Sequence, residues 1–224
     1  MKLLLHIFLS VCSIAAVNTA RAQFVHEKDY KPVTTKDYTE MVGSPYLYDD
    51  WVPGTVKLSN GVSSKDEMLL KYDLLNDEVY FKDKSGETMA FVVPVQEFIL
   101  NPTVIDATAA SIYRSGYKGV EGSKPSAFYE VLSDGKVQLL KKVSKIIFES
   151  QNIGSATKTK TFMDKTKYYL VINGAVLAIK NDKKSLLTAL SDKQVALAEY
   201  LKTNKINFKN DNELGKLVNY YNTL

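Results

Sequence analysis

The chain has 224 residues, a formal net charge of +4 at pH 7, one cysteine and two histidines. This length is enough for a core of ordinary size in one domain, or in one domain with an appendage. The small net charge gives little attraction for nucleic acid. The scarcity of cysteine and histidine argues against zinc sites built on them and against Cys–His or Ser–His–Asp nucleophiles.

Residues 1–22 have the pattern of a secretory signal peptide. Lys2 precedes an apolar run from Leu3 to Val17, which is short for a membrane span, and Ala20-Arg21-Ala22 forms a cleavage site before Gln23. We therefore expect an exported protein of the periplasm, the cell surface or the extracellular space, with the signal peptide cleaved after Ala22. We expect no transmembrane segment after cleavage.

Cleavage would change the composition of the mature chain. Lys2, Arg21 and Cys12 all lie in the signal, so the net charge falls to +2 and no cysteine remains. An exported protein without cysteine forms no disulfide bonds, so its core alone must hold the fold together.

Residues 23–50 show no clear hydrophobic period and are expected to form an extended N-terminal arm lying on the domain. The aromatic residues of this region bring a large apolar area that can hold the arm in place. They are Tyr38, Tyr46 and Tyr48, with Trp51 just beyond.

Residues 51–180 are expected to form a β-rich body. Short runs of alternating apolar and polar residues are separated by pairs typical of tight turns. These pairs are Asn60-Gly61, Asn76-Asp77, Ser85-Gly86, Asp134-Gly135 and Asn173-Gly174. The pattern predicts a predominantly antiparallel meander of about nine or ten strands, either a sandwich or a partly closed barrel.

Three parts of this body have sequence patterns of their own. The hairpin signal from Lys167 to Lys180 is the clearest in the chain, and the polar segment Ser150–Lys160 before it is expected to be a loop. Residues 103–125 stay open, because Val104–Tyr113 fits either a strand or a short helix. The glycines at 116, 119 and 122 then indicate a mobile loop, since they lack the order of a phosphate-binding loop.

Residues 181–224 are expected to form a tail of two to three helices packed on the body. Asn181 or Asp182 can cap the first helix, Ser191 with Gln194 forms a capping box for the second, and Asn210 with Glu213 resembles the same device. An apolar stripe on the last helix indicates the face that packs. It consists of Leu214, Leu217, Val218 and Tyr221.

Catalytic motifs are not evident. His26 is the only histidine of the mature chain, and Asp49-Asp50 lacks the spacing of a calcium loop. Ser115 with Lys118, and Ser155 with Lys158, match S-x-x-K, but both lie in expected loops and no K-T-G motif accompanies them. We therefore assign no catalytic residue, cofactor or metal ligand, although paired carboxylates for glycoside hydrolysis stay open.

A basic stretch is the one conspicuous charge feature. Between positions 141 and 167 it holds seven lysines and only two acids, Glu149 and Asp164. The stretch fits either a solvated rim, in which lysines protect strand edges, or a binding surface for an anionic ligand such as lipopolysaccharide, an acidic glycan or a membrane surface. The candidate binding residues are Lys141, Lys142, Lys145, Lys158, Lys160, Lys165 and Lys167.

Several stretches together resemble a widespread group of uncharacterised exported proteins of Gram-negative bacteria of the Bacteroidota type. They are Gly54–Gly61, Leu70–Asp73, Phe128–Leu132 with Asp134–Lys136, Lys167–Leu170 with Asn173-Gly174, and Leu217–Asn222. The resemblance implies export and a β-rich body with C-terminal helices. That group has no assigned activity, so the resemblance transfers no functional residues.

Two functions follow as hypotheses. The first is a non-enzymatic binding or scaffold protein of the periplasm or cell surface, which fits the lack of a nucleophile motif. The second is a carboxylate-based hydrolase acting on glycans in the same compartment, which requires a cleft holding two suitably spaced carboxylates.

Overall fold

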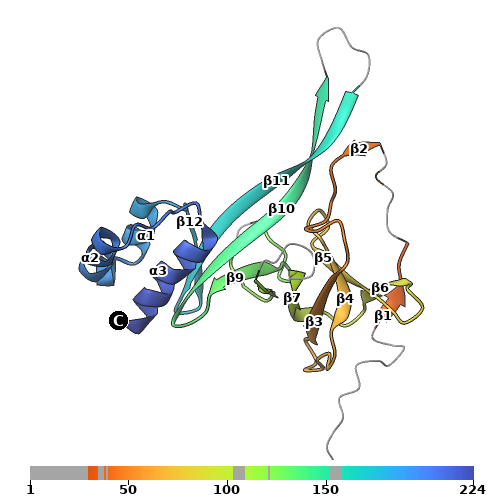
Figure 1. Ribbon diagram of the computed structural model, residues 1–224, viewed down its shortest axis with the longest axis horizontal. Helices are drawn as coiled ribbons and strands as arrows, with labels where there is room; N and C mark the ends of the chain where they lie inside the picture. Colours follow the sequence, from red (N-terminus) through yellow and green to blue (C-terminus); the bar gives the residue numbers. More distant parts are fainter. Residues whose placement is uncertain (1–29, 35–37, 39, 103–108, 121, 152–157) are drawn as a thin grey trace, which may run out of the picture.

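The computed structural model describes residues 30–34, 38, 40–102, 109–120, 122–151 and 158–224. In this part of the chain a single twelve-stranded sheet is followed by three helices (Figure 1). The strands are β1 (Tyr30–Pro32), β2 (Met41–Val42), β3 (Val52–Leu58), β4 (Met68–Asp73), β5 (Glu78–Lys82), β6 (Thr88–Phe91), β7 (Val95–Leu100), β8 (Ser111–Arg114), β9 (Tyr129–Ser133), β10 (Val137–Gln151), β11 (Lys158–Ile172) and β12 (Ala175–Ile179). The predicted signal peptide and His26 lie outside the described residues.

The sheet is an antiparallel meander with few departures from chain order. Its strands pair in the order β1-β6-β5-β4-β3-β7-β8-β9-β10-β11-β12, and β2 adds in parallel to β11. The sheet is not closed into a barrel. The predicted fold class is therefore confirmed: α+β, predominantly antiparallel, with the helices at the C-terminal end.

The turn pairs explain why the meander forms where it does. Asn173 and Gly174 have φ angles of +51° and +80°, and Asp77 has φ +61°. Positive φ strains most side chains, so asparagine, aspartate and glycine at these positions favour tight turns. The hairpin predicted around Asn173-Gly174 is confirmed, with Ile172 and Ala175 paired on either side of the turn.

Two local expectations need correction. Ser150–Lys160 is not one loop, because Ser150 and Gln151 end β10 and Lys158–Lys160 begin β11; residues 152–157 lie outside the described part. The polar residues here remain in the ladder, in which Glu149 lies opposite Lys160 and forms its ion pair with Lys158, at 2.7 Å. In the region left open, β8 is a strand, while residues 103–108 are not described.

The N-terminal region contributes short edge elements. β1 pairs with β6 and β2 pairs with β11, so both add to the sheet. Tyr38 packs its ring edge-on against Phe162 of β11, with the ring centroids 5.3 Å apart. Tyr46 and Trp51 flank the ammonium group of Lys71, at 4.6 and 5.5 Å from the two ring centroids.

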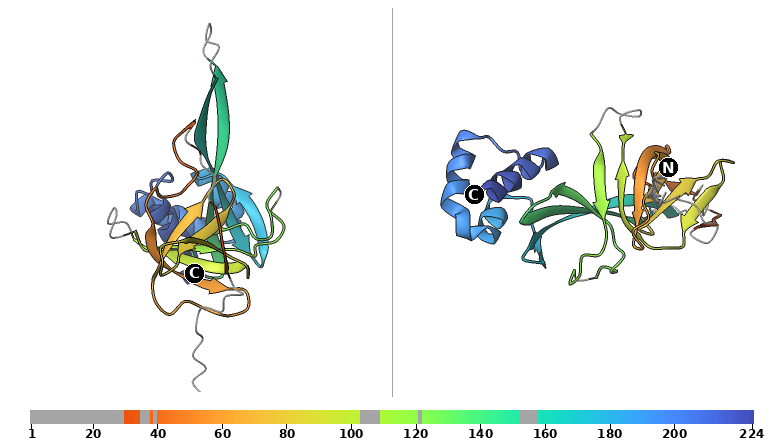
Figure 2. Two further views of the ribbon diagram at one scale, coloured as in Figure 1. Left: turned by 90° about the vertical axis from the view of Figure 1, so that its right-hand side faces the viewer. Right: turned by 90° about the horizontal axis from the view of Figure 1, so that it is seen from below.

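The three helices form a tail that covers one end of the sheet (Figure 2). They are α1 (Lys183–Ala189), α2 (Gln194–Thr203) and α3 (Asp211–Thr223). Asp182 caps α1 by accepting from the backbone N–H of Ser185 at 2.7 Å, and Asn210 caps α3 by accepting from Glu213 N–H at 3.1 Å. These two predicted caps are confirmed.

The predicted capping box at Ser191 is wrong. Ser191–Lys193 forms a short 3-10 helix, and α2 begins after it at Gln194 with no side-chain cap. The reason is local: the tighter 3-10 turn already bonds the N–H of Gln194 to Ser191 C=O.

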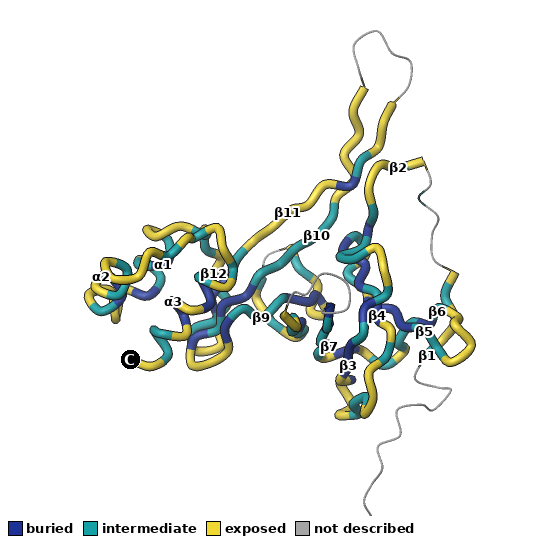
Figure 3. The backbone as a smooth tube through the Cα atoms, in the orientation of Figure 1, coloured by how far each residue is buried: buried dark blue, intermediate teal, exposed yellow. Residues whose placement is uncertain are grey.

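Buried side chains form separate clusters at the two ends of the sheet (Figure 3). One lies among β3–β8 and contains aromatic residues such as Phe98, Tyr72 and Tyr113. The other joins β10 and β11 to the helices, and three of the four predicted stripe residues are buried in it, with Tyr221 partly buried. A smaller cluster around Tyr129 and Tyr169 lies on the opposite face of β10 and β11.

Candidate functional site

The β10–β11 hairpin is the most prominent feature of the molecule. Its strands pair without a register shift from Val137 opposite Ile172 to Gln151 opposite Lys158. The end near the helices, Val137–Lys145 and Tyr168–Ile172, is buried or half-buried, whereas the distal part projects beyond the rest of the sheet and is largely exposed (Figures 1 and 3). All seven lysines of the basic stretch lie on this hairpin.

Four of these lysines have ion-pair partners. Lys158 lies 2.7 Å from Glu149 across the hairpin, and Lys145 lies 3.3 Å from Asp164. Lys141 and Lys142 pair with residues outside the hairpin. Lys160, Lys165 and Lys167 are exposed and have no ion pair with any residue that the structure describes.

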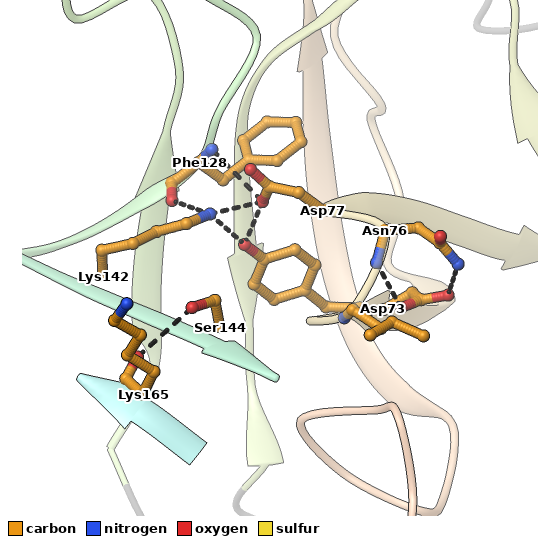
Figure 4. Close-up of polar contacts among 9 residues, drawn as sticks. Asp73, Asn76, Asp77, Phe128, Lys142, Ser144 and Lys165 are labelled. Atoms are coloured by element: carbon orange, nitrogen blue, oxygen red, sulfur yellow. Dashed lines mark hydrogen bonds and ion pairs between the residues drawn. The ribbon is translucent and has the colours of Figure 1, made fainter. Parts of the chain in front are cut away.

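Lys142 is held in a polar network between the hairpin and the strands that precede it (Figure 4). Its Nζ lies 2.6 Å from Asp77 Oδ1 and donates to the carbonyl oxygen of Phe128 at 2.9 Å. The Tyr72 hydroxyl donates to the same Asp77 oxygen at 2.5 Å. Burial lowers the pKa of Lys142 and raises the pKa of Tyr72 well above its usual range. Lys142 therefore holds the hairpin against the turn after β4 and is not free to meet a ligand.

Lys141 makes a comparable connection to the tail. Its Nζ lies 2.6 Å from Asp211, the first residue of α3, and 3.4 Å from Glu130 of β9. The Tyr168 hydroxyl donates to the other Asp211 oxygen at 2.8 Å. Burial, together with the hydrogen bond to Asp211, raises the pKa of Tyr168 to about 12. For Lys141, burial lowers the pKa but the two carboxylates raise it by more.

An open groove of about 920 Å³ lies where β12 ends beside β11. Its lining includes three lysines, Lys141, Lys167 and Lys180, and two tyrosines, Tyr168 and Tyr169. Among the described residues that line it, Asp182, which caps α1, carries the one carboxylate. The groove can thus hold a negatively charged or mixed polar and apolar ligand.

An apolar strip lies on one face of the projecting hairpin. Ile146 is paired with Met163 across the strands, and Phe148 follows on the same face two residues further along β10. Their exposed fractions are 46 %, 45 % and 51 %. Sequence reasoning missed this strip, although the run Lys145–Glu149 contains three consecutive large apolar residues that cannot all face one core.

Of the two serines in the S-x-x-K matches, Ser115 lies in the described part of the chain and has a structural role. The Ser115 hydroxyl donates to the carbonyl of Val95 at 2.9 Å, so it is engaged with backbone, and Ser155 is not described. Among the described residues, no three His, Cys, Asp or Glu side chains gather closely enough to hold a metal ion. No helix in the described part of the chain is long and apolar enough to span a membrane.

Comparison of the chain with protein-family models, with curated proteins and with solved structures finds no match.

Proposed function

We propose that the protein is exported and acts as a non-enzymatic binding protein of the periplasm or cell surface, taking an anionic ligand on the β10–β11 hairpin. The observation that carries the proposal is the exposed half of this hairpin. It combines three lysines without an ion-pair partner in the described part of the chain, Lys160, Lys165 and Lys167, with an exposed apolar strip. Exposed apolar surface beside unpaired charge is typical of interaction sites.

Two further observations support this proposal. The signal-like residues 1–22 and the resemblance to exported Bacteroidota-type proteins favour export. Secretion followed by mass spectrometry tests this part, with a mature chain beginning at Gln23 as the expected result.

The alternative, a carboxylate-based glycan hydrolase, has less support from the described grooves. Two carboxylates about 5–10 Å apart in one cleft are needed for that chemistry. The described residues that line the groove beside β12 include one carboxylate, that of Asp182. A second groove of about 270 Å³ holds Asp73, whose carboxylate accepts from Leu75 N–H, Asn76 N–H and the Asn76 side-chain amide. A carboxylate occupied in this way is poorly placed to act on a substrate.

Binding to heparin, dextran sulfate and phosphatidylglycerol vesicles, measured by thermal shift and calorimetry, tests the binding function. We expect a variant with Lys160, Lys165 and Lys167 all changed to Gln to bind about tenfold more weakly, and wild-type binding to fall steeply between low and physiological salt. The matched control changes three exposed lysines of the tail region, Lys183, Lys205 and Lys209, to Gln. Equal losses in both variants, or binding that does not depend on salt, would contradict the proposal.

A further inference from the structure

One edge of β11 is covered at both ends and open in the middle. β12 pairs with Tyr168–Ile172, and β2 pairs with Lys160 and Thr161. Between them, Phe162–Lys167 pairs with β10 on one side and with no described strand on the other. Met163–Lys167 are all exposed. We call the uncovered side of Phe162–Lys167 the open edge.

Three residues of the open edge, Phe162, Asp164 and Thr166, direct their backbone groups away from β10, and of these Phe162 is buried next to β2. In a strand, N–H and C=O groups of successive residues point to opposite edges. Ile172 lies next to the two-residue turn and directs its backbone groups to β12, so even-numbered residues of β11 do the same. Lys145 of β10, which lies opposite Asp164, is consistent with this alternation. Its N–H points away from β11 and donates to the C=O of Leu74. Asp164 and Thr166 therefore offer their N–H and C=O groups to an added strand.

The side chains along the open edge favour an acidic partner. Lys165 and Lys167 lie on one face of β11, and neither has an ion pair with a described residue. Lys180, which also has no ion pair with a described residue, adds a third ammonium group at the end of the edge, in the lining of the groove beside β12. On the same face as Lys165, Met163 offers an apolar neighbour. A strand with acidic residues opposite the lysines and an apolar residue opposite Met163 would form favourable cross-strand pairs.

We infer that an extended, acidic segment of a partner protein binds by adding as a strand to the open edge, filling the gap between β2 and β12. The gap is about 20 Å long, which matches six extended residues. Main-chain hydrogen bonds to Asp164 and Thr166 supply affinity, and Lys165 and Lys167 supply the preference for acidic side chains. A second copy of this chain fits less well, because pairing through the same edge brings two lysine-rich edges together. The inference rests on the proposed function and names the chemistry of its ligand.

Amide hydrogen exchange followed by NMR tests the main-chain contacts directly. The probe is a short peptide of alternating valine and glutamate with blocked ends, and its counterpart has lysine in place of glutamate. With the acidic peptide we expect exchange at Asp164 and Thr166 to slow by about tenfold or more, because these amides gain acceptors. Exchange at Met163 and Lys165 should change little, since their amides are already directed at β10. Lack of protection at Asp164 and Thr166, or equal binding of the two peptides, overturns the inference.

Thr166→Pro tests the same contact by mutation. Proline removes the N–H at the open edge and is tolerated on edge strands where that N–H faces solvent. We expect binding of the acidic peptide to weaken by about tenfold, whereas Thr166→Val, which keeps the N–H, binds like the wild type. Ile147→Pro is the matched control, because it removes an N–H from the far edge of β10. Circular dichroism verifies that each variant is folded, and the exchange experiment on the wild type needs no variant.

The two proposals fail in different ways. If Thr166→Pro binds the acidic peptide normally while the triple lysine variant still loses polyanion binding, strand addition is wrong and the anionic surface stands. If the triple variant binds polyanions normally, the proposed function itself is wrong. A dimer that sedimentation detects in the wild type and that Thr166→Pro abolishes would make a second copy the occupant, and would overturn the inference of an acidic partner.

Discussion

The lysines of the hairpin differ in what surrounds their ammonium groups. Lys142 is largely buried and meets Asp77, a carbonyl oxygen and a tyrosine hydroxyl, whereas Lys165 is exposed. Identical residue types in one basic stretch therefore have different roles. The inner lysines connect the hairpin to the body and the tail, and the outer ones remain available to a ligand.

Lys142→Met should lower the free energy of unfolding by about 2–4 kcal/mol, the range between a lost charged hydrogen bond and a broken buried ion pair. The reason is that the Asp77 carboxylate would lose its ammonium partner in a partly buried site. Urea denaturation measures the change. Lys165→Met is the control and should stay within about 0.5 kcal/mol of the wild type.

A double-mutant cycle with Asp77→Asn separates the pair from the packing of the lysine stem. We expect the double variant to be less destabilised than the sum of the two single variants, since removing both charges leaves neither unpaired. Strict additivity would show that the ion pair contributes nothing and that the Lys142 stem alone stabilises the hairpin.

At the level of single residues, local conformations could be predicted from the sequence, whereas long-range contacts could not. Turn pairs such as Asn173-Gly174 were predictable, because the backbone conformation that they favour is local. The pairing of Lys142 with Asp77 was not, because it depends on which strands become neighbours and on how far the hairpin extends. Lys141 and Lys142 contact acids outside the hairpin, but in the sequence they cannot be distinguished from the exposed lysines.

At the scale of elements, the contact between α3 and β9 depends on an absent side chain. Gly215 is buried, and a Cβ atom built there would lie 2.6 Å from the carbonyl oxygen of Leu132. Two side chains near the end of α3 add hydrogen bonds, Asn222 to the first residue of β10 and Asn219 to the last residue of β9. Asn222 accepts from the N–H of Val137 and donates to its C=O, both at 2.9 Å, as a paired strand would. Ser133 donates to Asn219 at 2.7 Å.

Gly215→Ala should therefore destabilise the protein, although alanine is the better helix former by about 1 kcal/mol. The added methyl group must displace α3 from β9, since the atom that it meets belongs to the backbone. Thermal unfolding followed by circular dichroism measures the change in Tm. Lys216→Ala, at an exposed position of the same helix, should leave Tm nearly unchanged or raise it slightly. An unchanged or higher Tm for Gly215→Ala would show that the contact can relax.

Element boundaries were less predictable than element types. The apolar stripe of α3 was recognisable because a helix repeats every 3.6 residues. The length of β10 and β11 was not, because their distal halves carry polar and charged residues that a local reading assigns to a loop. These residues stay extended through cross-strand contacts, such as the ion pair of Glu149 with Lys158, that exist only once the register is set. The open edge of β11 follows from that register, so it could not be predicted from the sequence either.

At the scale of the whole molecule, one sheet carries separate hydrophobic clusters toward its two ends. The cluster among β3–β8 contains none of the tail residues, and the helical cluster contains none of the residues of β3–β8. The β10–β11 hairpin joins them, with Lys142 connected to the first region and Lys141 to the tail. Cooperativity between the two ends must therefore pass largely through β8–β10 and these polar contacts.

Leu217→Asp tests how far the two ends unfold independently. Leu217 is fully buried in the helical cluster, and a carboxyl group there costs several kcal/mol or forces α3 away from the sheet. We expect native-state hydrogen exchange to lose protection in α3, in β9 and in the end of β10 that α3 contacts, while β3–β7 keep theirs. Val195→Asp is the matched control, because Val195 on α2 is 86 % exposed and the change should leave all amides protected as before. Equal loss of protection in β3–β7 would show instead that the continuous sheet unfolds as one unit, with the hairpin transmitting the destabilisation from one end of the molecule to the other.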